Sequence, residues 1–367
     1  MAQTFLLMGG DGIGPEVVAE ARRVLAHLIE RDRLDITIDE RPYGAAEYQA
    51  TGKLVSDQTL DDLMEVDAVL FGATGGPDMD AVPREARAAG SLLRIRKQMD
   101  VFANLRPVRV PEALLDVTPL KPEKAKGVDL IIVRELTSGL YFGQPKMIED
   151  LGDGRRRGTD TQTYTSDEIH RVARAAFELA RSRSGRVTSV DKSNVMESGK
   201  LWRQEVTAIG QAEYKDVTLE HILGDNCGMQ LVLNPGQFDV LLADNMFGDI
   251  LSDVAAGATG SLGMLPSASL SAADEAGRSR ALYEPVHGSA PDIAGQGIAN
   301  PAAAIQSVAL AFRHSFGLDD LADEIVAAVD HTLGLGIRTP DICPPDREPA
   351  TTTAFTDAVI AAFGANR

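Results

Sequence analysis

Residues 4–29 read TFLLMGGDGIGPEVVAEARRVLAHLI. The apolar run 4–8 predicts a buried β-strand, and residues 15–29 predict a helix because their apolar side chains recur along one stripe. A dinucleotide-binding G-x-G-x-x-G pattern begun at Gly10 would need its third glycine where Pro15 stands, and the turn lacks the glycine-lysine ending of a P-loop. The stretch therefore predicts an α/β protein whose first turn is structural rather than a Rossmann phosphate loop.

The same alternation of short apolar runs with helical patterns continues along the chain. It predicts further strands at 68–72, 128–133, 187–190 and 238–243, and helices at 166–182, 247–258, 301–314, 318–333 and 353–363. Ser166 is the predicted N-cap of the helix at 166–182. Strands that alternate with helices pair mostly in parallel, so we expect a sheet flanked by helices.

A glycine- and arginine-rich stretch, GDGRRRG at 152–158, interrupts this alternation. Extended, threonine-rich sequence follows it at 159–165. Two interpretations are open on these residues alone. The stretch is either an exposed hairpin arm that pairs with a second subunit, or a mobile surface loop.

Composition excludes several classes of protein. The chain has 367 residues, of which 44% are hydrophobic and 25% charged, as in ordinary globular proteins. Its 36 Lys and Arg against 54 Asp and Glu give a net charge of -18, which disfavours nucleic-acid binding. No run has the length of a membrane span, and the apolar start lacks the basic flank of a signal peptide. Cys227 and Cys343 suggest neither a disulfide framework nor a metal site, so we expect a reducing cytoplasm.

Three aspartates are candidate ligands of a metal ion. Asp249 and Asp253 are four residues apart in a helical pattern, so their side chains project from one face of the helix. Two like charges at this spacing repel each other, and a hard divalent cation such as Mg²⁺ or Mn²⁺ would reverse the effect. Asp225, in the sequence GDNC, is the third candidate. The alternative is that these residues are ordinary surface charge.

Arginines, a tyrosine and a lysine follow predicted strands or lie in polar turns near them. The guanidinium groups of Arg96, Arg106 and Arg134 suit the two-point recognition of a dicarboxylate. Tyr141 lies in a glycine-punctuated turn, and Lys192 ends another strand. Loops after parallel strands are where α/β proteins assemble active sites, and these two side chains are a candidate proton donor and a candidate general base.

A second polar turn, EPVHGSAPDI at 284–293, is followed by GIANP at 297–301. Its backbone-permissive residues and its His, Asp and Asn side chains suit the binding of adenosine and ribose. Asp292 could accept hydrogen bonds from ribose hydroxyls and would repel a 2′-phosphate. The alternative is a structural loop in which Asn300 caps the helix that follows.

Six stretches together resemble the isocitrate/isopropylmalate dehydrogenase family of β-decarboxylating dehydrogenases. They are GDGIGPE (10–16), NLRPVR (104–109), VRELTSGLYFG (133–143), VDKSNVMESGKLWR (190–203), NMFGDILSDVAAGATGSLGMLPSASL (245–270) and EPVHGSAPDIAGQGIANP (284–301). The matches keep their order from the first predicted strand to the last third of the chain. The resemblance therefore covers essentially the whole sequence.

The resemblance implies a two-domain α/β fold with a large mixed sheet flanked by helices, without a Rossmann unit. Residues 1–101 plus 260–367 would form a discontinuous cofactor-binding domain. Residues 102–259 would form a second domain that carries the dimer contact, with an arm near 150–165. A homodimer with shared active sites is the implied assembly, with no nucleic acid and no membrane as partner.

The resemblance also implies roles for the candidate residues. The substrate carboxylates would be bound by Arg96, Arg106 and Arg134. Asp249 and Asp253 would hold Mg²⁺ or Mn²⁺ together with Asp225 of the neighbouring subunit, which also contacts the substrate. Lys192, again from the neighbour, would be the general base, and Tyr141 would protonate the enol carbon. The residues implied to bind NAD are Glu284, His287, Gly288, Ser289, Ala290, Pro291, Asp292, Ile293 and Asn300.

The segment before Arg96 is implied to select the substrate. Leu92 and Leu93 stand where relatives that act on tricarboxylates have small polar residues, and Val195 would face them by analogy. An apolar pocket favours an alkyl group because an unpaired buried carboxylate is costly. We therefore expect NAD-dependent oxidative decarboxylation of (2R,3S)-3-isopropylmalate to 4-methyl-2-oxopentanoate and CO₂ in leucine biosynthesis. The alternatives are another 3-alkylmalate, D-malate, tartrate or homoisocitrate, or a catalytically silent regulatory subunit.

Overall fold

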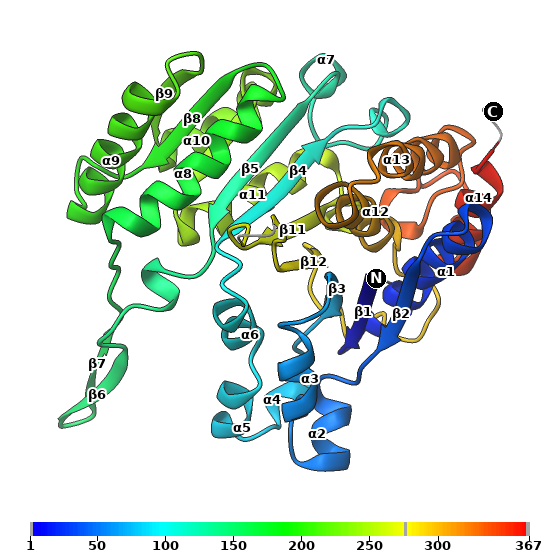
Figure 1. Cartoon of the computed structure of the whole chain (residues 1–367), viewed down its shortest axis with the longest axis horizontal. Helices are drawn as coiled ribbons and strands as arrows, with labels where there is room; N and C mark the ends of the chain where they lie inside the picture. Colours follow the sequence, from blue (N-terminus) through cyan, green and yellow to red (C-terminus); the bar gives the residue numbers. More distant parts are fainter. Residues whose placement is uncertain (1–2, 275–276, 365–367) are drawn as a thin grey trace. The chain divides into compact units, whose positions relative to one another are not determined.

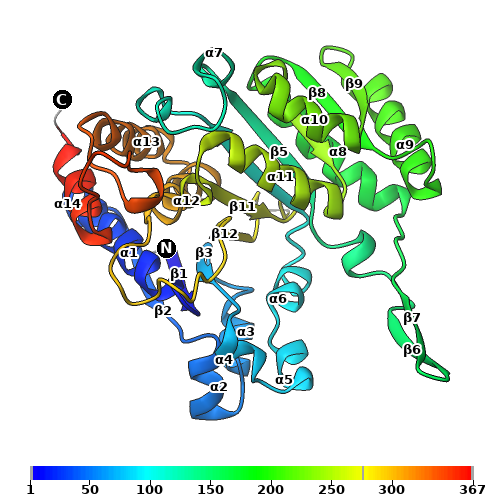
Figure 2. The ribbon, with the colours of Figure 1, turned by 180° about the vertical axis from the view of Figure 1, so that it is seen from behind.

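A computed structural model describes residues 3–274 and 277–364 of the chain (Figures 1 and 2). The chain divides into two compact units. Unit 1 comprises Met1–Val101, Arg109–Gly127 and Ala256–Arg367, and unit 2 comprises Phe102–Val108 and Val128–Ala255. The units differ from the domain boundaries expected from the sequence mainly in residues 109–127. The expected boundaries and domain roles remain predictions.

Unit 1 contains five sheet strands in the order β2-β1-β3-β12-β11. Their bounds are β1 Gln3–Gly10, β2 Ile36–Glu40, β3 Ala68–Ala73, β11 Pro266–Leu270 and β12 Ala281–Pro285. β1 pairs in parallel with both β2 and β3, β12 pairs in parallel with β3, and β11 runs antiparallel to β12. The apolar run of β1 is fully buried, as a strand in the middle of a helix-covered sheet requires.

The helices of unit 1 are α1 Gly14–Asp32, α2 Ala45–Thr51, α3 Asp57–Asp62, α4 Pro77–Asp80, α5 Arg84–Ala89, α6 Leu92–Gln98, α7 Pro122–Ala125, α12 Ala302–Ala311, α13 Asp319–Gly334 and α14 Thr352–Ala362. α1 begins with Pro15 in its first turn, where the missing N–H costs nothing. The helix expected at 301–314 ends earlier as an α-helix. A π-helical turn, Phe312–Phe316, continues it.

Unit 2 contains the strands β4 Ala103–Arg109, β5 Asp129–Glu135, β8 Arg186–Asp191, β9 Thr218–Leu223 and β10 Val240–Ala243, in the order β4-β5-β10-β8-β9. The division assigns only the last residue of β4 to unit 1. The β5–β10, β10–β8 and β8–β9 pairs are all parallel. Parallel strands end at the same edge of a sheet, so the residues that follow β5, β8 and β10 are neighbours.

The helices of unit 2 are α8 Ser166–Arg181, α9 Glu197–Glu213, α10 Gly224–Leu233 and α11 Asn245–Thr259, of which the division assigns residues 256–259 to unit 1. The prediction that Ser166 caps α8 is wrong. Thr165 is the N-cap, and its side chain and that of Glu168 form a reciprocal capping box that satisfies backbone N–H groups at the helix start. Ser166 is the first residue of the helix itself.

The stretch that interrupts the alternation is a two-stranded antiparallel hairpin, β6 Met147–Gly152 with β7 Arg155–Thr159. Both views show it extending away from the other elements of unit 2 (Figures 1 and 2). Nearly all of its side chains are exposed. The hairpin interpretation is therefore the one the structure bears out, and its pairing with a second subunit remains a prediction.

The glycine turn after β1 is held by the protein itself. The N–H groups of Asp11 and Ile13 donate to the carbonyls of Ala73 and Ser289, both at 2.8 Å. A Cβ on Gly10, where φ is +79°, would lie 1.9 Å from the Ala73 carbonyl oxygen, so only glycine fits there. These N–H groups already donate to backbone carbonyls of the protein. This supports the interpretation that the turn is structural.

The architecture confirms the expected fold class. Ten strands, five in each unit, alternate with helices, and the antiparallel pair β11–β12 beside the parallel pairs makes the pattern mixed. Across the described ranges, no helix combines the length and the apolar character needed to cross a membrane.

Candidate active site

Asp249, in the second turn of α11, is the meeting point of three side chains of unit 2. Arg134, near the end of β5, donates from Nη1 to Asp249 Oδ1 at 2.5 Å. Tyr141, in the turn after β5, donates from its hydroxyl to Asp249 Oδ2 at 2.9 Å. Arg106 of β4 places Nη1 3.4 Å from Asp249 Oδ1. Two expected substrate arginines, the expected proton donor and an expected metal ligand thus form one cluster.

The cluster is buried on its cationic side and open on its anionic side. The side chains of Arg106 and Arg134 are only 8% and 3% exposed, whereas that of Asp249 is 36% exposed. Burial, and next the charge of Asp249, raise the pKa of Tyr141 above its ordinary value. Tyr141 therefore keeps its proton at neutral pH, which suits a proton donor.

Asp253 lies one helical turn beyond Asp249. Burial raises the pKa of Asp253, the charge of Arg106 opposes this rise, and the charge of Asp249 adds to it. The two carboxylates balance the two guanidinium groups of the cluster. A divalent cation and a dianionic substrate could therefore enter together without changing the net charge.

The donor set suits a hard cation because its oxygens come from carboxylates. Asp249 and Asp253 alone make an incomplete set of ligands. Within residues 3–274 and 277–364, no three His, Cys, Asp or Glu side chains gather closely enough to hold a metal ion. A third ligand from a neighbouring subunit, as the resemblance implies, would complete the set.

Lys192 and Asp225 form a second pair in unit 2. Lys192 lies just after β8, and Asp225 lies at the start of α10. Lys192 Nζ donates to Asp225 Oδ1 at 2.7 Å. This hydrogen bond is the main cause that lowers the pKa of Asp225. Val195, in the following turn, is 69% exposed. The expected base, the expected shared metal ligand and an expected pocket residue therefore lie on neighbouring turns.

The third expected substrate arginine, Arg96, belongs to unit 1. It forms an ion pair with Glu284 of β12, with Nη2 2.9 Å from Oε2, and both side chains are largely buried. Glu284, expected to bind the cofactor, thus neutralises Arg96 in this structure. Leu92 and Leu93 are the first two residues of the same helix, α6, and Leu93 is 38% exposed.

The expected cofactor loop lies after β12. The ring Nε2 of His287 is buried without a hydrogen-bond partner, while its Nδ1 lies 2.9 Å from the Gly288 carbonyl oxygen. Ser289 is buried, with its carbonyl bound to the turn after β1. Asp292 is exposed, as binding to ribose hydroxyls requires. Gly288 is also exposed, and the N–H of Ile293 donates to the carbonyl of Ala290 in the turn that contains Pro291 and Asp292.

Asn300 does the work of a helix cap, although the N-cap position belongs to Pro301. Its side-chain carbonyl accepts from the N–H of Ala302 at 3.0 Å, and its amide donates to Asp341 Oδ2 at 3.0 Å. The structure therefore contains a capping hydrogen bond to Asn300, but the N-cap residue itself is Pro301 and not Asn300 as predicted. A role for Asn300 in binding the cofactor remains a prediction.

Comparison with known proteins places this chain in a family. Residues 4–359 match the model of the isocitrate/isopropylmalate dehydrogenase family. The chain belongs to this family. The resemblance inferred from the six sequence stretches is thereby confirmed.

Curated relatives match this chain over nearly its full length. The chain is 54% identical to a 3-isopropylmalate dehydrogenase of Brucella melitensis, over 99% of each chain. It is 55% identical to 3-isopropylmalate dehydrogenase 1 of Bordetella bronchiseptica, over 98% of this chain and 97% of that one. The crystal structure of isocitrate dehydrogenase from Methylococcus capsulatus is 32% identical, with a TM-score of 0.84 over 98% and 99% of the two chains.

Some residues around the cluster were not singled out from the sequence. Asn104 and Ser252 bind the guanidinium of Arg106, at 2.8 and 2.5 Å. Asn245 binds Arg134 through its side-chain carbonyl. The signal that could have found them is a polar side chain at the end of an apolar strand or on the inward face of a helix, because such a group needs a buried partner.

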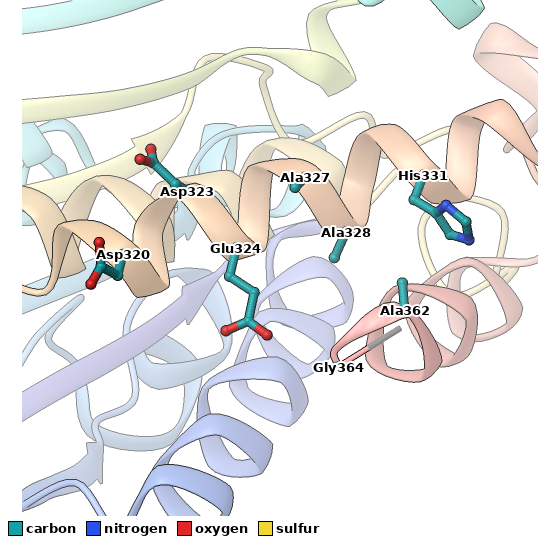
Figure 3. A pocket seen from close by; sticks show the side chains of 8 residues that line it. All are labelled: Asp320, Asp323, Glu324, Ala327, Ala328, His331, Ala362 and Gly364. Atoms are coloured by element: carbon teal, nitrogen blue, oxygen red, sulfur yellow. The ribbon is translucent and has the colours of Figure 1, made fainter. Parts of the chain in front are cut away.

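A cavity of about 360 Å³ lies elsewhere in unit 1, between α13 and α14 (Figure 3). Its lining consists of Asp320, Asp323, Glu324, Ala327, Ala328, His331, Ala362 and Gly364. Glu324 accepts two hydrogen bonds from Arg31, and Asp323 contacts Arg313. Because arginines already balance two of its carboxylates, we assign no ligand to it.

Proposed function

We propose that this family member oxidises and decarboxylates (2R,3S)-3-isopropylmalate to 4-methyl-2-oxopentanoate and CO₂ in leucine biosynthesis. The observation that carries the proposal is the cluster at Asp249, in which Arg106, Arg134 and Tyr141 meet one carboxylate. Curated relatives named for this activity, 54–55% identical over nearly the whole chain, support the choice of substrate.

NAD and Mg²⁺ or Mn²⁺ are the proposed cofactors. When bound, NAD would supply a hydride acceptor for the oxidation of the substrate at C2, and the cation would supply a Lewis acid. Asp249 and Asp253, with Asp225 of a neighbouring subunit, would hold the cation. The exposed carboxylate of Asp292 supports NAD over NADP, because it would repel a 2′-phosphate.

The chain's own residues supply charge and proton transfer. Arg106 and Arg134 would hold the substrate carboxylates, a task for which buried, fixed guanidinium groups are well suited. Lys192 would take the proton of the C2 hydroxyl as the ketone forms. Loss of CO₂ would then leave an enolate, and Tyr141, kept protonated by its raised pKa, would deliver a proton to C3.

We propose a homodimer that shares its two sites. Exposed apolar side chains lie on the hairpin, on α10 and on α11, where an isolated subunit would leave them in water. They are Met147, Ile148, Leu151, Met229, Val232, Leu233 and Ile250. A symmetric dimer would cover them and bring a second Lys192–Asp225 pair to each cluster.

The cytoplasm is the proposed location. Cys227 and Cys343, the two cysteines of the chain, are both free thiols in the structure. Free thiols suit a reducing compartment.

Turnover of a substrate panel tests the proposal. NADH formation is measured with 3-isopropylmalate, D-malate, homoisocitrate and isocitrate, each with Mg²⁺ and with EDTA. We expect the highest kcat/KM for 3-isopropylmalate and no turnover with EDTA. Higher kcat/KM for isocitrate, or turnover that survives EDTA, would contradict the proposal. A complete lack of turnover across the panel would favour a regulatory subunit.

A further inference from the structure

We infer that Asn245 and Gly248 are positioning residues that seat Arg134, and the inference rests on the proposed role of Arg134 in binding a substrate carboxylate. Both lie in the first turn of α11, next to Asp249. Neither would touch the substrate. They act through the guanidinium group, one by a hydrogen bond and one by leaving space.

Asn245 is fully buried, and both the oxygen and the nitrogen of its side-chain amide form hydrogen bonds. Its carbonyl oxygen accepts from Nε and Nη2 of Arg134, at 3.0 and 2.7 Å. Its amide donates to the Ser138 carbonyl at 2.9 Å, which fixes the orientation of the group. One edge of the guanidinium is thus held, and Nη1 is directed to Asp249.

The acceptor that holds this edge is neutral. A carboxylate in its place would bind the guanidinium more strongly and would cancel its charge. An amide oxygen orients Arg134 without adding a second anion to the one, Asp249, that its guanidinium already contacts. This is the combination that a carboxylate-binding arginine requires.

Capping of α11 does not explain Asn245. Asp244, the residue before it, performs that task, because its Oδ1 accepts from the N–H of Phe247 at 2.8 Å and its carbonyl accepts from that of Gly248 at 2.8 Å. The Asn245 side chain instead turns toward Arg134 and Ser138. Its contacts therefore serve the arginine rather than the helix.

Gly248 provides the space in which Arg134 lies. A Cβ at this position would be 2.6 Å from Cγ and 2.7 Å from Cβ of Arg134. Alanine normally stabilises a helix relative to glycine. The space that the Arg134 side chain needs is therefore the reason for a glycine at position 248. Gly257, in the same helix, has no atom within 4 Å of an added Cβ and offers a matched control.

The test compares Gly248→Ala, Asn245→Asp and the control Gly257→Ala. We expect the first two to raise the KM for the dicarboxylate substrate about ten- to hundred-fold, the range of one hydrogen bond to a charged group, with a smaller fall in kcat. Gly257→Ala should match the wild type. The rise in melting temperature on adding D-malate with Mg²⁺ compares the same variants without turnover. This test therefore remains valid even if 3-isopropylmalate is not the substrate.

A double-mutant cycle separates positioning from general stability. Asn245→Ala should raise KM strongly in the wild type and little in an Arg134→Lys background, because the group it positions is already altered. If Asn245→Ala does not fold, Asn245→Asp takes its place in the cycle. Additive effects on KM, or wild-type KM and protection in Gly248→Ala and Asn245→Asp, would overturn the inference.

Discussion

Lys192 and Asp225 are joined by a 2.7 Å hydrogen bond although they lie on different strand–helix connections. The register of the sheet explains their proximity. β8 and β9 are parallel neighbours in which Asp191 pairs with Leu223, so the turns that follow the two strands start side by side. The expected base and the expected shared metal ligand are therefore held next to each other by the sheet.

Lys192→Met should abolish turnover and leave substrate binding nearly intact. The Lys192 side chain donates to the exposed Asp225 and lies on a turn outside the buried core, so its removal should change stability little. NADH formation and calorimetric binding of 3-isopropylmalate measure the two effects. Lys200→Met, at an exposed lysine of α9, is the control and should retain activity. Turnover above a few per cent of wild type in Lys192→Met would remove this residue as the base.

Mixed dimers test whether the sites are shared. Asp249→Asn and Lys192→Met should each be inactive alone. If each site takes Asp249 from one subunit and Lys192 from the other, refolding an equimolar mixture restores one intact site in each heterodimer, about a quarter of wild-type activity. A site built within a single subunit would show no recovery on mixing.

The local patterns in the sequence predicted what short-range physics controls. Helical spacing placed Asp249 and Asp253 on one face of α11, and the apolar run of β1 predicted its burial. Contacts between side chains that are far apart in the sequence could not be predicted in this way. Arg96 pairs with Glu284, and Arg106 with Ser252, only because the strand order and register bring distant segments together.

The cap of α8 was also predicted incorrectly, because the sequence offers two similar residues side by side. Ser166 and Thr165 are adjacent and chemically alike, and a shift of one residue decides which of them is the cap. The role of Asn245 also depends on a distant partner, Arg134. Residues whose function lies in a long-range contact therefore remained outside the sequence prediction.

Tyr141→Phe should separate the two halves of the reaction. The hydroxyl donates to Asp249 and is the proposed source of the C3 proton, so its loss should slow decarboxylation more than hydride transfer. Rapid mixing should show a burst of NADH followed by slow steady-state turnover. Hydride transfer and product release that slow by the same factor would contradict the assignment.

Leu233→Asp should dissociate the proposed dimer and reduce activity with it. Leu233 is 54% exposed at the end of α10, within the apolar set on the hairpin, α10 and α11. Leu335→Asp is the control, since Leu335 is 63% exposed and lies outside that set. Sedimentation velocity should show a monomer only for Leu233→Asp. A dimer that persists in this variant would place the interface elsewhere.

Glu135→Gln should change how stability depends on pH. Glu135 is fully buried at the end of β5 and accepts hydrogen bonds from the backbone N–H groups of Thr137 and Ser138, both at 3.0 Å. Burial nevertheless raises its pKa from 4.5 to about 7. The folded protein therefore binds a proton more tightly than the unfolded chain does. The stability from this proton is fully present below pH 4.5 and is lost as pH rises through about 7.

The wild-type free energy of unfolding should thus fall, relative to that of Glu135→Gln, between pH 4.5 and about 7. The difference can change by at most about 1.4 kcal/mol per pH unit, the limit for one proton. Urea unfolding at several pH values across this window measures it, and the exposed Glu123→Gln is the control and should follow the wild type throughout. Parallel pH profiles for the wild type and Glu135→Gln would show that Glu135 is ionised in the folded protein across the whole window.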